Sequence, residues 1–140
     1  MIIYNLIHVY KSTDCYHDIK NLGYYSSYEN AYEAIEYYKE TQGFCDNKNG
    51  FAIVPYNVDS DLLNLQVVYD VYVYIHDDVY DYEYTQLLGI LDKRDKANTM
   101  VELFKQNNRL LFLNNLKIET EIDETKIDEL QWKEGFTSDD

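Results

Sequence analysis

The stretch 19-IKNLGYYSSYENAYEAIEYY-38 passes from a strand pattern directly into a helix pattern. Residues 19–27 are typical of a strand that ends in a helix-cap signal. Ser26 and Glu29 have the spacing of a capping box, in which two side chains accept the first helical N–H groups. Apolar and aromatic residues then recur at helical spacing, with glutamates between them: Tyr28, Ala31, Tyr32, Ile35 and Tyr38. The stretch predicts a strand followed by a helix that ends near Gly43.

The segments on either side of this stretch both have strand character. The β-branched and aromatic run 2-IIYNLIHVY-10 comes first, and 51-FAIVPYNV-58 follows the Asn-Gly turn in 46-DNKNG-50. Pro55 lacks a backbone N–H, so the last strand is expected at a sheet edge or at a bulge. Residues 1–62 therefore predict a β-β-α-β arrangement.

The second half of the chain follows the same plan. Tyr4, Ile7 and His8 match Tyr72, Ile75 and His76, and Leu22-Gly23 matches Leu88-Gly89. By the same alignment Asp92 is a second N-cap, the stripe of a second helix falls at Ala97, Val101 and Phe104, and a last strand spans 110–122. Residues 66–122 thus predict a second β-β-α-β repeat.

A repeat of this length is marginal by itself, so the two are expected to pack together. The predicted class is α+β, mostly antiparallel sheet with two helices, in a single compact unit. The remaining segment, 123–140, is expected to return to the core through Trp132 and Phe136, with residues 137–140 frayed.

The run G-Y-Y-S-S-x-E-x-A-x-x-A-I from Gly23 to Ile35, the later N-G-F-x-I from Asn49 to Ile53, and the closing W-x-E-G-F from Trp132 to Phe136 resemble a family of small uncharacterised bacterial α+β domains. In that family the closing motif follows soon after the third strand, whereas here the second repeat intervenes. The resemblance implies a small α+β fold without an assigned activity, and a loose association with immunity and anti-defence proteins.

The charge balance limits the classes of partner. The 140 residues carry 26 Asp and Glu against 12 Lys and Arg, a formal net charge of −14. Nucleic acids and anionic membranes need clustered cations on their partners, so we expect neither as a direct ligand. A basic protein would be attracted instead. The N-terminal residues do not have the pattern of a signal peptide, no apolar run suits a membrane span, and a cytoplasmic location is expected.

Reactive side chains do not form a recognisable catalytic or metal motif. His8, His17 and His76 lack helical pairing, and Cys15 and Cys45 lack a C-x-x-C spacing. Cys15, His17 and Asp18 share one short loop, whereas a Cys–His dyad usually draws on distant segments. The turn 46–50 departs from the Ca²⁺-binding loop pattern. We expect no catalytic residue, no metal centre and no cofactor; whether the two cysteines pair is left open.

The segment 76-HDDVYDYEY-84 combines dense negative charge with aromatic surface and contains neither Lys nor Arg. Tyrosines favour protein interfaces and can stack on guanidinium planes. Same-side carboxylates on a strand lie about 6.6 Å apart, a spacing able to engage successive phosphate-binding residues. We expect partner contacts at Asp77, Asp78, Tyr80, Asp81, Tyr82, Glu83 and Tyr84, with Glu119, Glu121, Asp123 and Glu124 in second rank. The alternative interpretation is a solvated loop.

The sequence thus favours a non-enzymatic acidic inhibitor that blocks a basic nucleic-acid-acting protein such as a nuclease, in a toxin-immunity or phage anti-defence role. One alternative is a module that self-associates, as a homodimer, through exposed strand edges. Another is an enzyme that uses a carboxylate pair with a divalent ion. Neither the partner's identity nor the choice between occlusion and allosteric inhibition follows from the residues.

Overall fold

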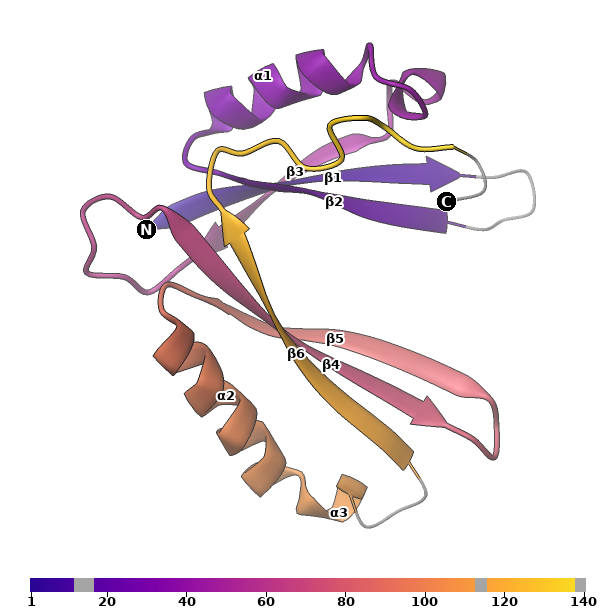
Figure 1. Cartoon of the computed structure of the whole chain (residues 1–140), viewed down its shortest axis with the longest axis vertical. Helices are drawn as coiled ribbons and strands as arrows, with labels where there is room; N and C mark the ends of the chain where they lie inside the picture. The colour runs from indigo at the N-terminus through magenta and orange to yellow at the C-terminus, as the bar shows by residue number, and fades with distance from the viewer. Residues whose placement is uncertain (12–16, 113–115, 138–140) are drawn as a thin grey trace. The chain divides into compact units, whose positions relative to one another are not determined.

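The computed structural model describes residues 1–11, 17–112 and 116–137. The predicted α+β class is confirmed, with two three-stranded antiparallel sheets and few helices (Figure 1). The chain divides into two compact units, Met1–Asn57 with Lys126–Asp140, and Val58–Thr125. Each unit is described separately below, and the packing of the two predicted repeats against each other stays a prediction.

The first unit is built around its first strand. Its elements are β1 (Ile2–Lys11), β2 (His17–Tyr25), α1 (Tyr28–Tyr38), the 3-10 turn η1 (Phe44–Asp46) and β3 (Phe51–Asn57). The sheet order is β2-β1-β3, with both neighbours antiparallel to β1. Pro55 therefore lies in an edge strand as predicted, opposite Tyr4, where its missing N–H is tolerated.

Helix α1 covers one face of this sheet (Figure 1). It buries Ala31, Ala34, Ile35 and Tyr38 against Leu6 and Leu22. Two residues predicted on the buried stripe are exposed instead, Tyr28 at 54% and Tyr32 at 50%. The helix also ends at Tyr38, earlier than the predicted end near Gly43, which has a φ of 87° and precedes η1.

The cap of α1 is one residue away from its predicted place. Ser27 is the N-cap, and its Oγ accepts the backbone N–H of Asn30 at 3.0 Å. Ser26 instead donates its backbone N–H and its hydroxyl to the carboxylate of Asp128, at 2.9 and 2.6 Å. The predicted capping box of Ser26 and Glu29 is wrong, because Ser26 hydrogen-bonds instead to Asp128, which is distant in sequence.

The C-terminal segment of the first unit packs through one of its two predicted anchors. Phe136 is buried in the core beside Phe44, whereas Trp132 remains 44% exposed. The buried Lys20 ammonium pairs with Asp18 and lies 4.2 Å from the Phe136 ring centroid and 4.9 Å from that of Trp132. These cation–π contacts let a buried charge hold the segment in place.

The second unit also has its first strand in the centre. Its elements are β4 (Val67–Asp77), β5 (Tyr82–Leu91), α2 (Arg94–Asn107), α3 (Arg109–Phe112) and β6 (Leu116–Lys126), with sheet order β5-β4-β6. Val71, Ala97 and Val101 form the core between β4 and α2. The predicted strand 110–122 is corrected: α3 occupies its start, residues 113–115 lie outside the described part, and β6 continues to Lys126.

Asp92 does not cap α2 as predicted. The N-cap residue is Lys93, which makes no side-chain cap hydrogen bond, while Asp92 forms an ion pair with Lys96 at 2.8 Å. Burial raises the pKa of Asp92, but hydrogen bonds from Lys96 and Ser60 outweigh it and hold the pKa below its ordinary value. A buried carboxylate is more stable with a charged partner than with weakly positive helix N–H groups alone.

His8 is fully buried in the first unit, among the rings of Phe44 and Phe51. Its Nε2 lies 2.9 Å from the Asn47 carbonyl oxygen, so this nitrogen carries the proton and donates it. Burial lowers the pKa of His8 below its ordinary value of 6.5, because a buried imidazolium would lose its hydration. The fold therefore favours neutral His8.

Acidification should weaken the first unit through His8. Below pH 6.5 the unfolded chain takes up a proton that the folded His8 resists, so stability falls as the pH drops through this window. We expect His8→Phe, which keeps an aromatic ring, to lose less stability between pH 7.5 and 5.5 than the unsubstituted chain. Urea unfolding followed by the fluorescence of Trp132, the only tryptophan, reports on this unit.

The matched control is His76→Phe in the second unit, where the histidine is partly exposed. It should leave the pH dependence seen by Trp132 unchanged. An equal pH slope in His8→Phe and the unsubstituted chain would contradict the assignment.

Candidate functional site

The acidic segment 76–84 is a tight hairpin and not the extended run assumed from its alternation. Asp77 pairs with Tyr82, so residues 78–81 form the turn between β4 and β5. Asp81 has a φ of 50°, a left-handed conformation that aspartate tolerates better than most residues. The turn brings together carboxylates that the parity of an extended strand would place on opposite sides.

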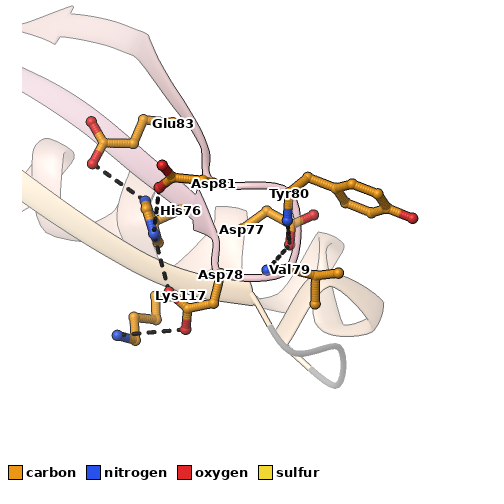
Figure 2. A network of polar contacts seen from close by, with 8 residues as sticks. All are labelled: His76, Asp77, Asp78, Val79, Tyr80, Asp81, Glu83 and Lys117. Carbon is orange, nitrogen blue, oxygen red and sulfur yellow. Dashed lines mark hydrogen bonds and ion pairs between the residues drawn. The ribbon is translucent and has the colours of Figure 1, made fainter.

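Asp77 holds the turn. Its Oδ1 accepts the backbone N–H of Val79 at 2.9 Å and approaches that of Tyr80 at 3.4 Å, as Figure 2 shows. An aspartate that bonds the backbone two residues later is a common way to nucleate a turn. The carboxylate of Asp77, one of the predicted contact residues, therefore already has a structural role in the turn.

Three other predicted carboxylates surround His76 (Figure 2). Its Nε2 lies 3.1 Å from Asp78 Oδ1 and 3.9 Å from Asp81 Oδ1, and its Nδ1 lies 3.3 Å from Glu83 Oε1. Lys117 of β6 reaches Asp78 Oδ2 at 3.5 Å and joins the third strand to the turn. The turn thus fixes three carboxylates around one half-buried imidazole.

Aromatic and apolar side chains at the same tip are largely exposed. Exposed fractions are 81% for Tyr80, 70% for Val79, 60% for Tyr82 and 43% for Tyr84. The ring of Tyr80 points away from the polar network in Figure 2. Tyr82 and Tyr84 alternate with Glu83 along β5, so they lie on the opposite face of the strand from its carboxylate. The tip presents charge on one face and rings on the other.

The second-rank residues on β6 separate into two groups. Strand alternation places Lys117, Glu119, Glu121 and Asp123 on one face. Glu124 lies on the other, toward α2, where its Oε2 accepts a hydrogen bond from Arg94 Nη2 at 3.0 Å. The fold thus brings Glu119, Glu121 and Asp123 together in one row and sets Glu124 apart.

Two carboxylates of this row crowd each other. Burial, then a hydrogen bond to Glu121 and its charge, raise the pKa of Asp123 above its ordinary value of 3.8. Burial, with Glu121 as hydrogen-bond acceptor and Asp123 nearby, likewise raises the pKa of Tyr74 to about 12. Burial and the neighbouring Glu121 therefore both disfavour the ionised form of Asp123.

A groove of about 270 Å³ lies between the hairpin and β6. Its lining combines carboxylates, rings and one cation: Tyr74, Ile75, His76, Glu83, Tyr84, Thr85, Lys117 and Glu119. Glu83 and Tyr84 come from the first-rank prediction and Glu119 from the second, so the fold places parts of both sets around one hollow.

Sequence reasoning missed the centre of this arrangement. His76, Tyr74 and Lys117 are not among the predicted contact residues. A signal for His76 exists, because it directly precedes the acidic run and a hairpin would turn that run back over it. For Lys117 no signal exists, since only strand pairing brings β6 to the turn.

Other predicted chemistry is not assembled in the described residues. Within 1–11, 17–112 and 116–137, no group of three His, Cys, Asp or Glu side chains is arranged to hold a metal ion. Cys45 is exposed, while Cys15 lies outside the described residues. No described helix is both long enough and apolar enough to traverse a bilayer.

Comparisons of the chain with protein-family models, curated proteins and solved structures found no match. The resemblance to small bacterial α+β domains stays a prediction.

Removing the charge of Asp123 should stabilise the second unit. Because its pKa is raised on folding, stability falls as the pH rises from 3.8 through the folded pKa, and the penalty persists at pH 7. We expect Asp123→Asn to gain about 0.5 kcal/mol at pH 7, typical of like charges on one sheet face, and to gain less near pH 4. Thermal unfolding followed by β6 amide signals measures both.

Glu119→Gln is the matched control on the same strand face, and it should change the melting temperature less. If Asp123→Asn is less stable than the unsubstituted chain, the fold stabilises the ionised carboxylate of Asp123. That result would contradict the direction of its pKa shift.

The turn should depend on the oxygen of Asp77 more than on its charge. Asp77→Asn keeps an acceptor for the N–H groups of Val79 and Tyr80, and we expect the turn to persist. Asp77→Ala loses a hydrogen bond of about 1 kcal/mol and should speed exchange of the Val79 amide roughly fivefold. If the Val79 amide exchanges at the same rate in Asp77→Asn and Asp77→Ala, the Asp77 oxygen does not stabilise the turn. Hydrogen exchange followed by NMR is the measurement.

Proposed function

We propose that the chain is a non-enzymatic acidic inhibitor protein that binds and blocks a basic, nucleic-acid-acting protein, with the tip of the β4–β5 hairpin as its contact surface. A nuclease is the partner class that best fits, in a toxin-immunity or phage anti-defence role. The chain then acts as a nucleic-acid mimic, without direct binding of nucleic acid.

The observation that carries the proposal is the convergence of fixed carboxylates and exposed rings at one end of one sheet. The turn gathers Asp78, Asp81 and Glu83 around His76, with Asp78 closest at 3.1 Å, and Val79, Tyr80 and Tyr82 stand exposed beside them. Ordered charge loses less conformational entropy on binding than charge on a mobile tail. The row Glu119, Glu121 and Asp123 extends this charge along β6.

Electrostatics supports a basic partner. A net charge of −14 speeds the encounter with a cationic surface. Burial first, and Glu121 in addition, raise the pKa of Asp123, and approaching Lys or Arg side chains would favour its ionised form. Exposed tyrosines offer contact area with few rotors to immobilise, and their faces can stack on arginine.

Self-association is the second candidate. β5 is an edge strand of the sheet β5-β4-β6, and it carries exposed Tyr82 and Tyr84. An exposed edge can pair with the same edge of another copy. Light scattering separates the candidates: a monomer that forms a 1:1 complex favours inhibition, and a dimer without partner favours self-association.

We also infer that the two units descend from one duplicated β-β-α-β element. Support comes from their common strand order, with the first strand central in each sheet. Support also comes from the second strands, where the pairing is irregular around Leu22-Gly23 in β2 and around Leu88 in β5. Bulges tend to persist in related structures.

Neutralising the tip should abolish partner capture. The variant Asp78→Asn/Asp81→Asn/Glu83→Gln removes three charges with little change of shape. We expect immobilised protein to retain nucleases or other basic nucleic-acid-binding proteins from host extract, and the variant to lose them. With the purified partner, association should slow about tenfold and lose much of its salt dependence.

Glu33→Gln/Glu36→Gln/Glu40→Gln removes the same charge from exposed positions in the first unit and is the matched control. If both triple variants lose binding equally, bulk charge and not the tip is responsible. If the tip variant binds at the unchanged rate, the proposed surface is wrong.

A further inference from the structure

The groove between the hairpin and β6 is lined mainly by hydrogen-bond acceptors. Glu83 and Glu119 supply carboxylates, Thr85 supplies a hydroxyl oxygen, and Lys117 is the one cation in the lining. The Lys117 Nζ lies 3.5 Å from Asp78 Oδ2, so Asp78 of the turn partly neutralises its charge. Within the described part of the chain, Glu119 has no ion-pair or hydrogen-bond partner. Such a lining suits a ligand that only donates.

His76 contributes a buried nitrogen that has no hydrogen-bond donor among the described residues. A neutral imidazole with its proton on Nε2 donates to Asp78 Oδ1 at 3.1 Å. Its Nδ1 is then an acceptor, and it faces Glu83 Oε1, another acceptor, at 3.3 Å. This Nδ1 is buried and has no hydrogen-bond partner in the described structure. Two acceptors at this distance need a proton on the ring or, where the exposed Glu83 side chain moves aside, an N–H from a ligand.

Resting on the proposed function, we propose that this groove receives a single arginine side chain of the basic partner. The guanidinium group donates toward His76 Nδ1, Glu83 and Glu119 and lies against the ring of Tyr74, which shares their face of the sheet. A guanidinium has five N–H donors in a planar fork and no acceptor, which matches the lining. Glu83 is 82% exposed, so its side chain can shift to admit the group.

The size of the groove favours one side chain over a larger ligand. Its volume, about 270 Å³, lies below the range of about 300–1,000 Å³ typical of small-molecule sites. Lysine fits less well, because an ammonium is a compact point charge that cannot bridge separated acceptors in one plane.

The test uses peptides, which need no identified partner. Acetyl-Gly-Arg-Gly-amide is titrated into the labelled full chain, with the lysine and the neutral citrulline peptides beside it. Binding of the arginine peptide is expected to saturate on the order of millimolar. NMR shifts should centre on residues 74–76, 83–85 and 117–119, with weaker lysine binding and none by citrulline. Shifts spread evenly over exposed acids elsewhere, such as those of α1, would overturn the proposal.

A charge-matched pair of variants localises the site. Glu119→Gln should weaken arginine-peptide binding by about threefold, as expected for one partly exposed charge pair. Glu102→Gln on α2, also exposed and in the same unit, should leave it unchanged. Equal effects of the two variants would show attraction by net charge alone and would overturn the proposal.

Failure here differs from failure of the inhibitor function. Suppose that the tip variant Asp78→Asn/Asp81→Asn/Glu83→Gln loses its partner, but the chain does not bind the arginine peptide in the groove and Glu119→Gln changes no binding. The inhibitor function then stands and the arginine subsite is wrong. If the peptide binds as described but the tip variant retains its partner, the subsite stands and the inhibitory surface is wrong.

Discussion

The second unit is governed by one constraint: a single helix covers one face of its sheet. Val71, Ala97 and Val101 make that buried contact, and a strand must place its next residue on the opposite side. The opposite side toward the hairpin end is filled by Tyr74, His76 and a row of β6 carboxylates. Amphipathic rings and charged groups tolerate partial exposure, which an aliphatic face would not. The acidic surface follows from this division of faces.

Charge on this surface is balanced unevenly. At the turn, backbone N–H groups hold Asp77, and His76 and Lys117 lie beside Asp78. Along β6, burial and then Glu121 raise the pKa of Asp123. The turn is thus electrostatically supported, while ionisation of Asp123 in the adjoining row is disfavoured. That contrast gives the proposed basic partner a physical role, because it would neutralise what the fold leaves unbalanced.

The first unit places its charges differently. Lys20 is buried, pairs with the partly exposed Asp18 and lies over the rings of Phe136 and Trp132, where it helps to fix the C-terminal segment. His8 is enclosed by aromatic rings and kept neutral, whereas His76, at the matching position of β4, is partly exposed and surrounded by carboxylates. Matching positions in sequence have acquired a core role in one unit and a surface role in the other.

By itself, the sequence determined most element types, because strand alternation, helical spacing and edge placement of Pro55 are local patterns. The exception is Arg109–Phe112, which forms α3 in place of the start of a predicted strand. It also determined that carboxylates and tyrosines would gather in 76–84. Only the tertiary structure decided the helix caps, because Ser26 hydrogen-bonds to Asp128 and Asp92 forms an ion pair with Lys96 instead of capping a helix. It also decided the geometry of the site: the turn folds Asp78 and Glu83 onto His76, and strand pairing brings Lys117 to them while sending Glu124 to α2. Contacts between residues distant in sequence depend on sheet register, which no local pattern encodes.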